Sequence, residues 1–270
     1  NIAVGWQAGD AITTTAGTIS IGTSALGGIT TTGDYTIAIG HSAMGGAEIG
    51  DGNIAIGYQS MQNANAAGFH RNIAIGYQTM ANVGSNSAAD NIAIGYQALQ
   101  NLNGSGDINI AIGKSAGAAL TTGDKITLVG HQAGTSLTGS NSALIGYFAG
   151  NAVTSGNNNT ALGKSTLQLE TTGSSNTALG ADALTTQNGA SSNTAVGKSA
   201  GLDITTGGSN TLVGASAGQN LTVGGGNIAI GATALNDETG ADDSVAIGRY
   251  ALLNQAVTTG DADNVGVGIS

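Results

Sequence analysis

The chain has 270 residues, of which 8% are charged and 3% are aromatic, while 47 are glycine and none is proline or cysteine. An enzyme core of this length normally contains many aromatic side chains and helices rich in Glu, Lys and Leu, so this composition argues against an ordinary globular enzyme. The lack of cysteine excludes disulfides and cysteine-bound metals, the lack of proline excludes collagen, and the net charge of −10 argues against nucleic acid as a partner.

An aliphatic residue followed by glycine recurs from one end of the chain to the other. We call these sixteen residues the key glycines: Gly5, Gly22, Gly40, Gly57, Gly76, Gly95, Gly113, Gly130, Gly146, Gly163, Gly180, Gly197, Gly214, Gly231, Gly248 and Gly268. Their intervals are 16 to 20 residues, and six successive intervals between Gly146 and Gly248 are all 17. Such a period is the signature of a repeat architecture, so we predict a single continuous repeat shaft over residues 1–270, as a segment of a longer fibre.

Each repeat begins with a short predicted strand formed by the three residues before the key glycine. Its first and third residues are mostly Ile, Val, Leu or Thr, and its middle residue is mostly Ala. This alternation predicts a branched face and a small Ala/Gly face. We expect stacking to bury the branched face between copies, and the Ala/Gly face to let neighbouring chains approach closely.

A bend and a polar return segment complete each repeat. Three places after the key glycine stands Ala, Ser or Thr, followed by Leu, Met or Gly. Another glycine, seven or eight places before the next key glycine, is expected to supply a positive φ at a tight corner. Because one repeat of about 17 residues cannot form a core alone, we predict an all-β parallel β-solenoid of about sixteen coils.

Asparagine recurs four places before the key glycine, and identical amides one strand apart can form a hydrogen-bonded ladder. We predict a structural ladder from nine of these residues: Asn53, Asn72, Asn91, Asn109, Asn159, Asn176, Asn193, Asn210 and Asn227.

Strings such as the one that runs from Asn53 to Gln59 (NIAIGYQ) resemble the head repeats of YadA-like trimeric autotransporter adhesins and the repeats of phage tail fibres. The resemblance covers essentially the whole chain. It implies a left-handed parallel β-roll, assembled as an intertwined or side-by-side trimer, with adhesive work at a cell or virion surface. The repeat is longer than the roughly fourteen residues typical of those heads.

The position directly after the key glycine holds most of the aromatic and basic residues. We predict a candidate ligand-binding stripe of Trp6, His41, Tyr58, Tyr77, Tyr96, Lys114, His131, Tyr147, Lys164, Lys198 and Arg249. Rings and cations in a line could stack on sugar faces and contact anionic glycans. The alternative is that these side chains cover the joint between neighbouring chains.

Other candidate chemistry is sparse. Asp34, Asp51, Asp107, Asp124 and Asp242 recur in the return segment and could hold calcium or simply keep the surface solvated. The three histidines have no nearby nucleophile or metal-ligand spacing, so we expect no enzyme activity, no metal and no cofactor. Threonine runs, including 13–15, 30–32 and 205–206, would suit ice binding, although their spacing drifts.

We therefore predict a non-catalytic, extracellular fibre segment on a virion or a cell-surface appendage. Its expected partners are copies of itself in a homotrimer and a cell-surface glycan or receptor. No apolar run reaches the roughly 18 residues of a membrane-spanning helix, so no membrane insertion by this segment is expected. The alternative is a purely structural extracellular filament that polymerises end to end.

Overall fold

In the computed structural model, the described residues are 1–10, 12, 15–28, 33–46, 48–66, 68–84, 87–253, 260–261 and 263–269. The chain forms two compact units, Asn1–Ser140 and Asn141–Ser270. Among the described residues there is no helix, and both units consist of short strands and turns. The single continuous shaft over 1–270 stays a prediction.

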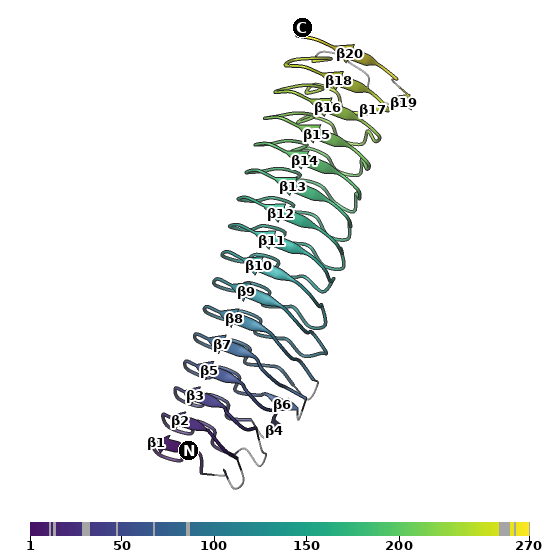
Figure 1. The fold of residues 1–270 in the computed structure, drawn as a ribbon. Helices are drawn as coiled ribbons and strands as arrows, with labels where there is room; N and C mark the ends of the chain where they lie inside the picture. Colours follow the sequence, from purple (N-terminus) through teal and green to yellow (C-terminus); the bar gives the residue numbers. More distant parts are fainter. Residues whose placement is uncertain are drawn as a thin grey trace. The chain divides into compact units, whose positions relative to one another are not determined.

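The first unit is a parallel β-solenoid in which each coil contributes one three-residue strand to the main sheet (Figure 1). Its strands are β1 (Ile2–Val4), β2 (Ile19–Ile21), β3 (Ile37–Ile39), β5 (Ile54–Ile56), β7 (Ile73–Ile75), β8 (Ile92–Ile94), β9 (Ile110–Ile112) and β10 (Thr127–Val129). They pair in this order and in one register. A smaller parallel pair joins β4 (Glu48–Ile49) to β6 (Asn65–Ala66).

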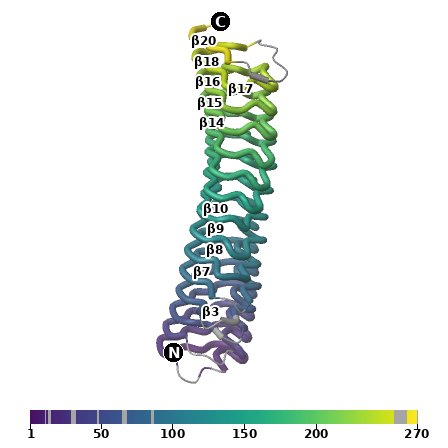
Figure 2. Tube along the Cα trace, turned by 90° about the vertical axis from the view of Figure 1, so that its right-hand side faces the viewer, coloured from purple at the N-terminus to yellow at the C-terminus, as the bar shows by residue number. Residues whose placement is uncertain are grey.

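The second unit repeats the same construction, and the tube in Figure 2 shows its coils wound one upon the next. Its main-sheet strands are β11 (Ala143–Ile145), β12 (Thr160–Leu162), β13 (Thr177–Leu179), β14 (Thr194–Val196), β15 (Thr211–Val213), β16 (Ile228–Ile230), β18 (Val245–Ile247) and β20 (Val265–Val267). The second pair is β17 (Ala241–Asp242) with β19 (Gly260–Asp261). The predicted all-β parallel solenoid with about 17 residues per coil is confirmed; its handedness and the number of chains stay predictions.

The structure places the small strand residues inside and the branched residues outside, so the expected assignment of the two faces is wrong. Ala38, Ala55 and Ala74 are fully buried, whereas the flanking isoleucines are half-buried or exposed, with Ile75 36% exposed. Small side chains suit the interior because Leu and Met from the following bend fill it: Met61 and Leu99, for example, are fully buried. The Ala/Gly face therefore faces the core of its own chain and cannot serve as the contact between chains.

Volume compensation across the core accounts for glycine at the fourth position after three of the key glycines. Where the middle strand residue is Leu instead of Ala, the bend residue is glycine. A Cβ built on Gly150 would lie 2.6 Å from Leu144, and one built on Gly218 would lie 2.8 Å from Leu212. The interior is thus close-packed, and these coils take their large side chain from the strand instead of the bend. Gly117 and Gly201 follow Ala in the strand, and there a Cβ would meet a leucine of a neighbouring coil, 2.7 Å from Leu128 and 2.8 Å from Leu184.

The key glycines are required where successive coils approach each other. Gly76 has a φ of +139°, and a Cβ built on it would lie 2.5 Å from the carbonyl oxygen of Gly95 in the next coil. The same clash recurs along both units, so any side chain here would both strain the backbone and push the coils apart.

Candidate functional site

The candidate stripe lies at the end of each main-sheet strand, where the chain turns after the key glycine. The glycine's positive φ bends the backbone, and the next side chain points away from the core. Tyr58, Tyr77 and Tyr96 are 42%, 44% and 45% exposed, and Trp6 is 70% exposed.

In the first unit, four consecutive members of the stripe form a stack of rings. The ring centroids lie 5.3 Å apart between His41 and Tyr58, 5.0 Å between Tyr58 and Tyr77, and 5.3 Å between Tyr77 and Tyr96, with interplanar angles of 15°, 10° and 6°. Lys114 continues the row, with its Nζ 5.8 Å from the centre of the Tyr96 ring. Stacking and the cation–π contact each contribute on the order of 1 kcal/mol.

This geometry limits what the stripe can bind. The faces of Tyr58 and Tyr77 are covered by neighbouring rings, and one face of Tyr96 is covered by Tyr77 while Lys114 lies over the ring. A sugar therefore has no free ring face to stack on along the inner part of the row. The ring edges and phenol hydroxyls are what a ligand would meet.

Two other stripe residues contact aromatic rings within their own coils. In the second unit, Tyr147 meets the neighbouring Phe148 edge-on at 4.3 Å, and Arg249 lies over the ring of Tyr250 at 4.5 Å. Trp6, His131, Lys164 and Lys198 occupy the predicted position in their own coils. Five of the eleven predicted residues thus form one continuous row of contacts: His41, Tyr58, Tyr77, Tyr96 and Lys114.

A row of glutamines beside the rings was not singled out from the sequence. Gln59, Gln78 and Gln97 directly follow the three stacked tyrosines and are half-buried. Gln78 Nε2 donates to Gln59 Oε1 at 2.9 Å, and Gln97 Nε2 donates to Gln78 Oε1 at 3.1 Å. The recurring Tyr-Gln pair in three successive repeats was the signal available in the sequence.

The asparagine ladder is buried and joins each coil mainly to the backbone of the next. Asn53 Oδ1 accepts from the backbone N–H of Asn72 at 2.9 Å, and Asn53 Nδ2 donates to the carbonyl of Phe69 at 2.7 Å. Direct amide-to-amide bonds accompany these contacts at four steps, including Asn91 to Asn72 at 3.0 Å. All nine asparagines of the predicted ladder are at most 1% exposed.

The recurring aspartates of the return segment accept hydrogen bonds from backbone N–H groups of the preceding coil. Asp51 Oδ1 accepts from the N–H of Asp34 at 2.9 Å, and Asp124 Oδ1 accepts from the N–H of Asp107 at 2.8 Å. Within the part of the chain that the structure describes, no three His, Cys, Asp or Glu residues gather as a metal site. These carboxylates act as coil-to-coil connectors.

Threonines of the return segment hydrogen-bond from one coil to the next. In the second unit, the hydroxyls of Thr205 and Thr222 donate to backbone carbonyls one coil further along, at 3.0 and 2.7 Å, so they stabilise the fold. Thr13, Thr14 and Thr30–Thr32 lie outside the described residues.

Within the described ranges, no helix has the length and hydrophobicity that crossing a membrane requires.

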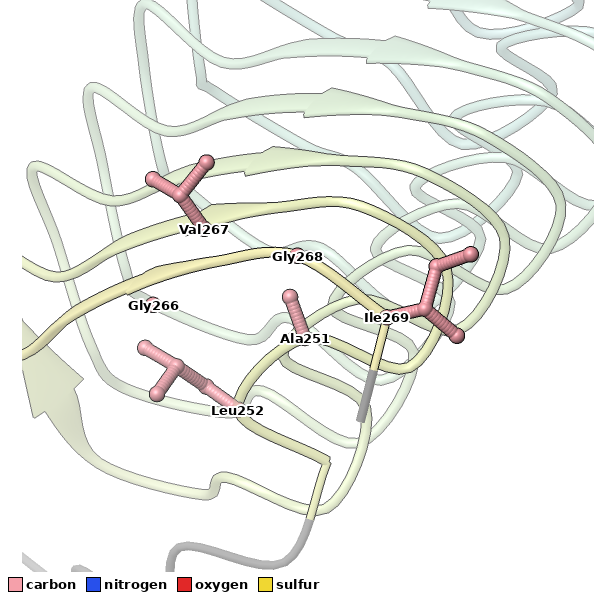
Figure 3. A pocket seen from close by; sticks show the side chains of 6 residues that line it. All are labelled: Ala251, Leu252, Gly266, Val267, Gly268 and Ile269. Carbon is pink, nitrogen blue, oxygen red and sulfur yellow. The ribbon is translucent and has the colours of Figure 1, made fainter.

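A hollow of about 170 Å³ lies beside β20 (Figure 3). It is bounded by Ala251, Leu252, Gly266, Val267, Gly268 and Ile269. These residues supply only aliphatic groups and backbone, so the hollow contains no side chain that could transfer a proton or attack a substrate.

An ion pair between Arg71 and Asp90 shifts the pKa values of both side chains. Arg71 Nε and Nη2 donate to the two carboxylate oxygens of Asp90 at 2.6 and 2.8 Å, and both residues are exposed. The hydrogen bond from Arg71 and then its charge lower the pKa of Asp90, and the same contacts raise the pKa of Arg71.

No family model matches the chain, and no curated protein is significantly similar to it.

Proposed function

We propose that this chain is a non-catalytic segment of an extracellular surface fibre, on a virion or a cell-surface appendage. In this proposal three copies associate side by side and the fibre attaches to a cell surface. The observation that carries the proposal is the outward face of the main sheets, which is mostly aliphatic, regular and without charge.

The outward positions of the three-residue strands hold only Ile, Val, Leu, Thr and Ala. Ile21, Ile110 and Ile112 are 37%, 36% and 38% exposed, and similar side chains continue through each unit. Soluble monomers rarely expose a contiguous apolar patch of this kind, so it favours a protein partner.

The same face suits a second copy of the chain. Covering an isoleucine that is about one-third exposed contributes roughly 0.5–1 kcal/mol, and each unit offers eight strands with two outward side chains each. The lack of charge on these strands avoids repulsion between copies, although each chain carries a net charge of −10. Cyclic symmetry closes such an assembly, and the resemblance to YadA-like heads favours three chains.

The ring stack supports the attachment part of the proposal. Exposed tyrosines held in a rigid row present contact area with little loss of side-chain freedom on binding. Identical copies of the row on several chains would multiply weak contacts.

Light scattering after size-exclusion chromatography tests the assembly. We expect the particle mass of three chains, and Ile75→Asp should reduce it towards one chain. Val223→Asp is the control, because Val223 is 50% exposed but lies outside the strands. A monomeric wild type, or an Ile75→Asp protein of unchanged mass, would refute the assembly.

Electron microscopy distinguishes the proposed fibre segment from the alternative function, a structural filament that polymerises end to end. A fibre segment should give particles of one length, whereas a polymer should lengthen with concentration. Binding to cells or to a glycan array tests attachment, and no binding by the intact assembly would refute that part.

A further inference from the structure

Two adjacent rows run along three successive coils of the first unit. The phenol row consists of Tyr58, Tyr77 and Tyr96, and the amide row consists of Gln59, Gln78 and Gln97. Both rows advance by one coil at a time, with ring centroids 5.0 and 5.3 Å apart.

The phenol row offers edges to a ligand, because the rings cover one another's faces. Tyr77 lies between two near-parallel rings and is still 44% exposed. Its ring edge and hydroxyl therefore form the accessible part. Such edges and hydroxyls match the rim of a sugar ring and its hydroxyl groups in chemistry.

The amide row is already ordered and retains hydrogen-bonding capacity. Gln78 uses one N–H to reach Gln59 and one lone pair to accept from Gln97. A primary amide has two N–H donors and two acceptor lone pairs, so one donor and one acceptor remain on Gln78. Fixing a glutamine side chain costs rotamer entropy, and the hydrogen bonds within the row have already fixed these side chains before any ligand binds.

We propose that the two rows bind an extended, neutral, linear polysaccharide that lies along the stack with about one sugar ring per coil. Adjacent strands are about 4.8 Å apart, which is close to the advance of an extended pyranose chain per sugar. The two rows themselves contain no charged residue, Lys114 lies beyond their last ring, and the net charge of −10 disfavours an anionic chain. The inference rests on the attachment part of the proposed function and specifies its ligand.

Calorimetric titration with β-1,4-linked glucose oligosaccharides, from the monosaccharide to the hexasaccharide, tests the proposal. Affinity should rise with each added sugar up to the trisaccharide and then level off, because the rows span three coils. The α-1,4-linked hexasaccharide has the same sugar in a coiled chain, and a polyuronate adds charge; both should bind at least tenfold more weakly.

Two conservative variants in the middle coil probe the rows directly. Tyr77→Phe keeps the ring stack and removes one hydroxyl, and Gln78→Asn retracts one amide while keeping a side chain that tolerates the φ of +50°. Each should weaken binding about three- to tenfold, the effect of one hydrogen bond. The controls are Tyr35→Phe and Gln62→Asn, which change the same residue types outside both rows and should leave the affinity unchanged.

The proposal is overturned if no neutral β-linked oligosaccharide binds, if affinity is independent of chain length, or if the two row variants bind like wild type. Cell or glycan-array binding that is as strong in Tyr77→Phe as in the wild type would leave attachment standing and remove only this ligand. If the intact wild-type assembly bound neither cells nor the glycan array, the attachment part of the proposed function would itself be refuted.

Discussion

Removing one rung of the asparagine ladder should loosen the second unit locally and strongly. Asn193 Oδ1 accepts from the backbone N–H of Asn210 at 2.8 Å, and its Nδ2 donates to the carbonyl of Gly207 at 2.8 Å and to Gln187 Oε1 at 3.0 Å. Asn193→Ala leaves these three groups buried and unpaired. At about 1–3 kcal/mol for each unsatisfied group, with partial relaxation, we expect a loss of roughly 3–6 kcal/mol.

Hydrogen exchange read out by mass spectrometry is the suitable assay, because a solenoid unfolds coil by coil and one global transition is not expected. A loss of 3–6 kcal/mol corresponds to an increase in exchange of about two to four orders of magnitude for amides in β14 and β15. Asn220→Ala is the matched control, since its amide bonds only to exposed Asp237. If Asn193→Ala changed protection no more than Asn220→Ala, the reasoning that the ladder holds coils together would be refuted.

Three further changes test other contacts. Gly76→Ala should destabilise the first unit by at least about 3 kcal/mol in chemical denaturation, because a Cβ there meets the Gly95 carbonyl and the φ is positive; a fully stable variant would contradict the steric argument. Gln187→Leu should raise hydrogen exchange in β12 and β13, because it removes the donor to buried Glu170 Oε2 at 2.8 Å; unchanged exchange would show that the carboxylate needs no such partner. The lowered pKa of Asp90 means that its pairing with Arg71 stabilises the fold above the ordinary Asp pKa and is lost as pH falls through the lowered value; Arg71→Ala should raise that pKa in an NMR titration, and an unshifted titration would contradict the pairing.

The fold could be predicted from the sequence because every coil repeats the same local signals. The spacing of the key glycines gave the coil length, and the alternation of Ile and Ala gave strands with two different faces. Alternation does not indicate which face of the strand lies in the core, and hydrophobicity alone favours placing the larger, branched side chains there. The informative signal was size: Leu128 and Leu144 replace Ala in the strand in the coils where Gly134 and Gly150 replace Leu or Met in the bend.

Backbone conformation at the corners was less predictable. The return-segment glycines were expected to have a positive φ, but at Gly106 and Gly123 this is wrong; the positive φ lies two residues later, at Ile108 and Lys125, with values of 59° and 56°. These glycines are needed because the next coil passes close by, as a Cβ on Gly106 would lie 3.0 Å from the Gly123 carbonyl. Contacts between coils impose that requirement, and a single repeat does not reveal it.

The candidate stripe was predictable as a line of side chains but its contacts were not. Spacing placed Tyr58, Tyr77 and Tyr96 in successive coils, and only the geometry revealed that the rings cover one another. The hypothesis of sugars stacked on ring faces therefore loses its main contact in the first unit. What remains is recognition by edges and hydroxyls, which the amide row of Gln59, Gln78 and Gln97 extends.

A regular solenoid also has to prevent its coils from pairing one repeat out of register. In the second unit the strands Thr160–Leu162, Thr177–Leu179 and Thr194–Val196 are almost interchangeable, and so are their asparagines. The core position that holds Glu170 and Gln187 in successive coils holds Ile204 in the next. Glu170 accepts backbone N–H groups from its own coil and from Gly189, together with the Gln187 amide. A slip of one coil would keep the bonds to Glu170 from its own coil but would set Oε2 against Ile204, whose side chain has no donor. A buried carboxylate oxygen left without a donor destabilises the slipped pairing. Register in this repeat is therefore specified by the few core positions that break the repeat.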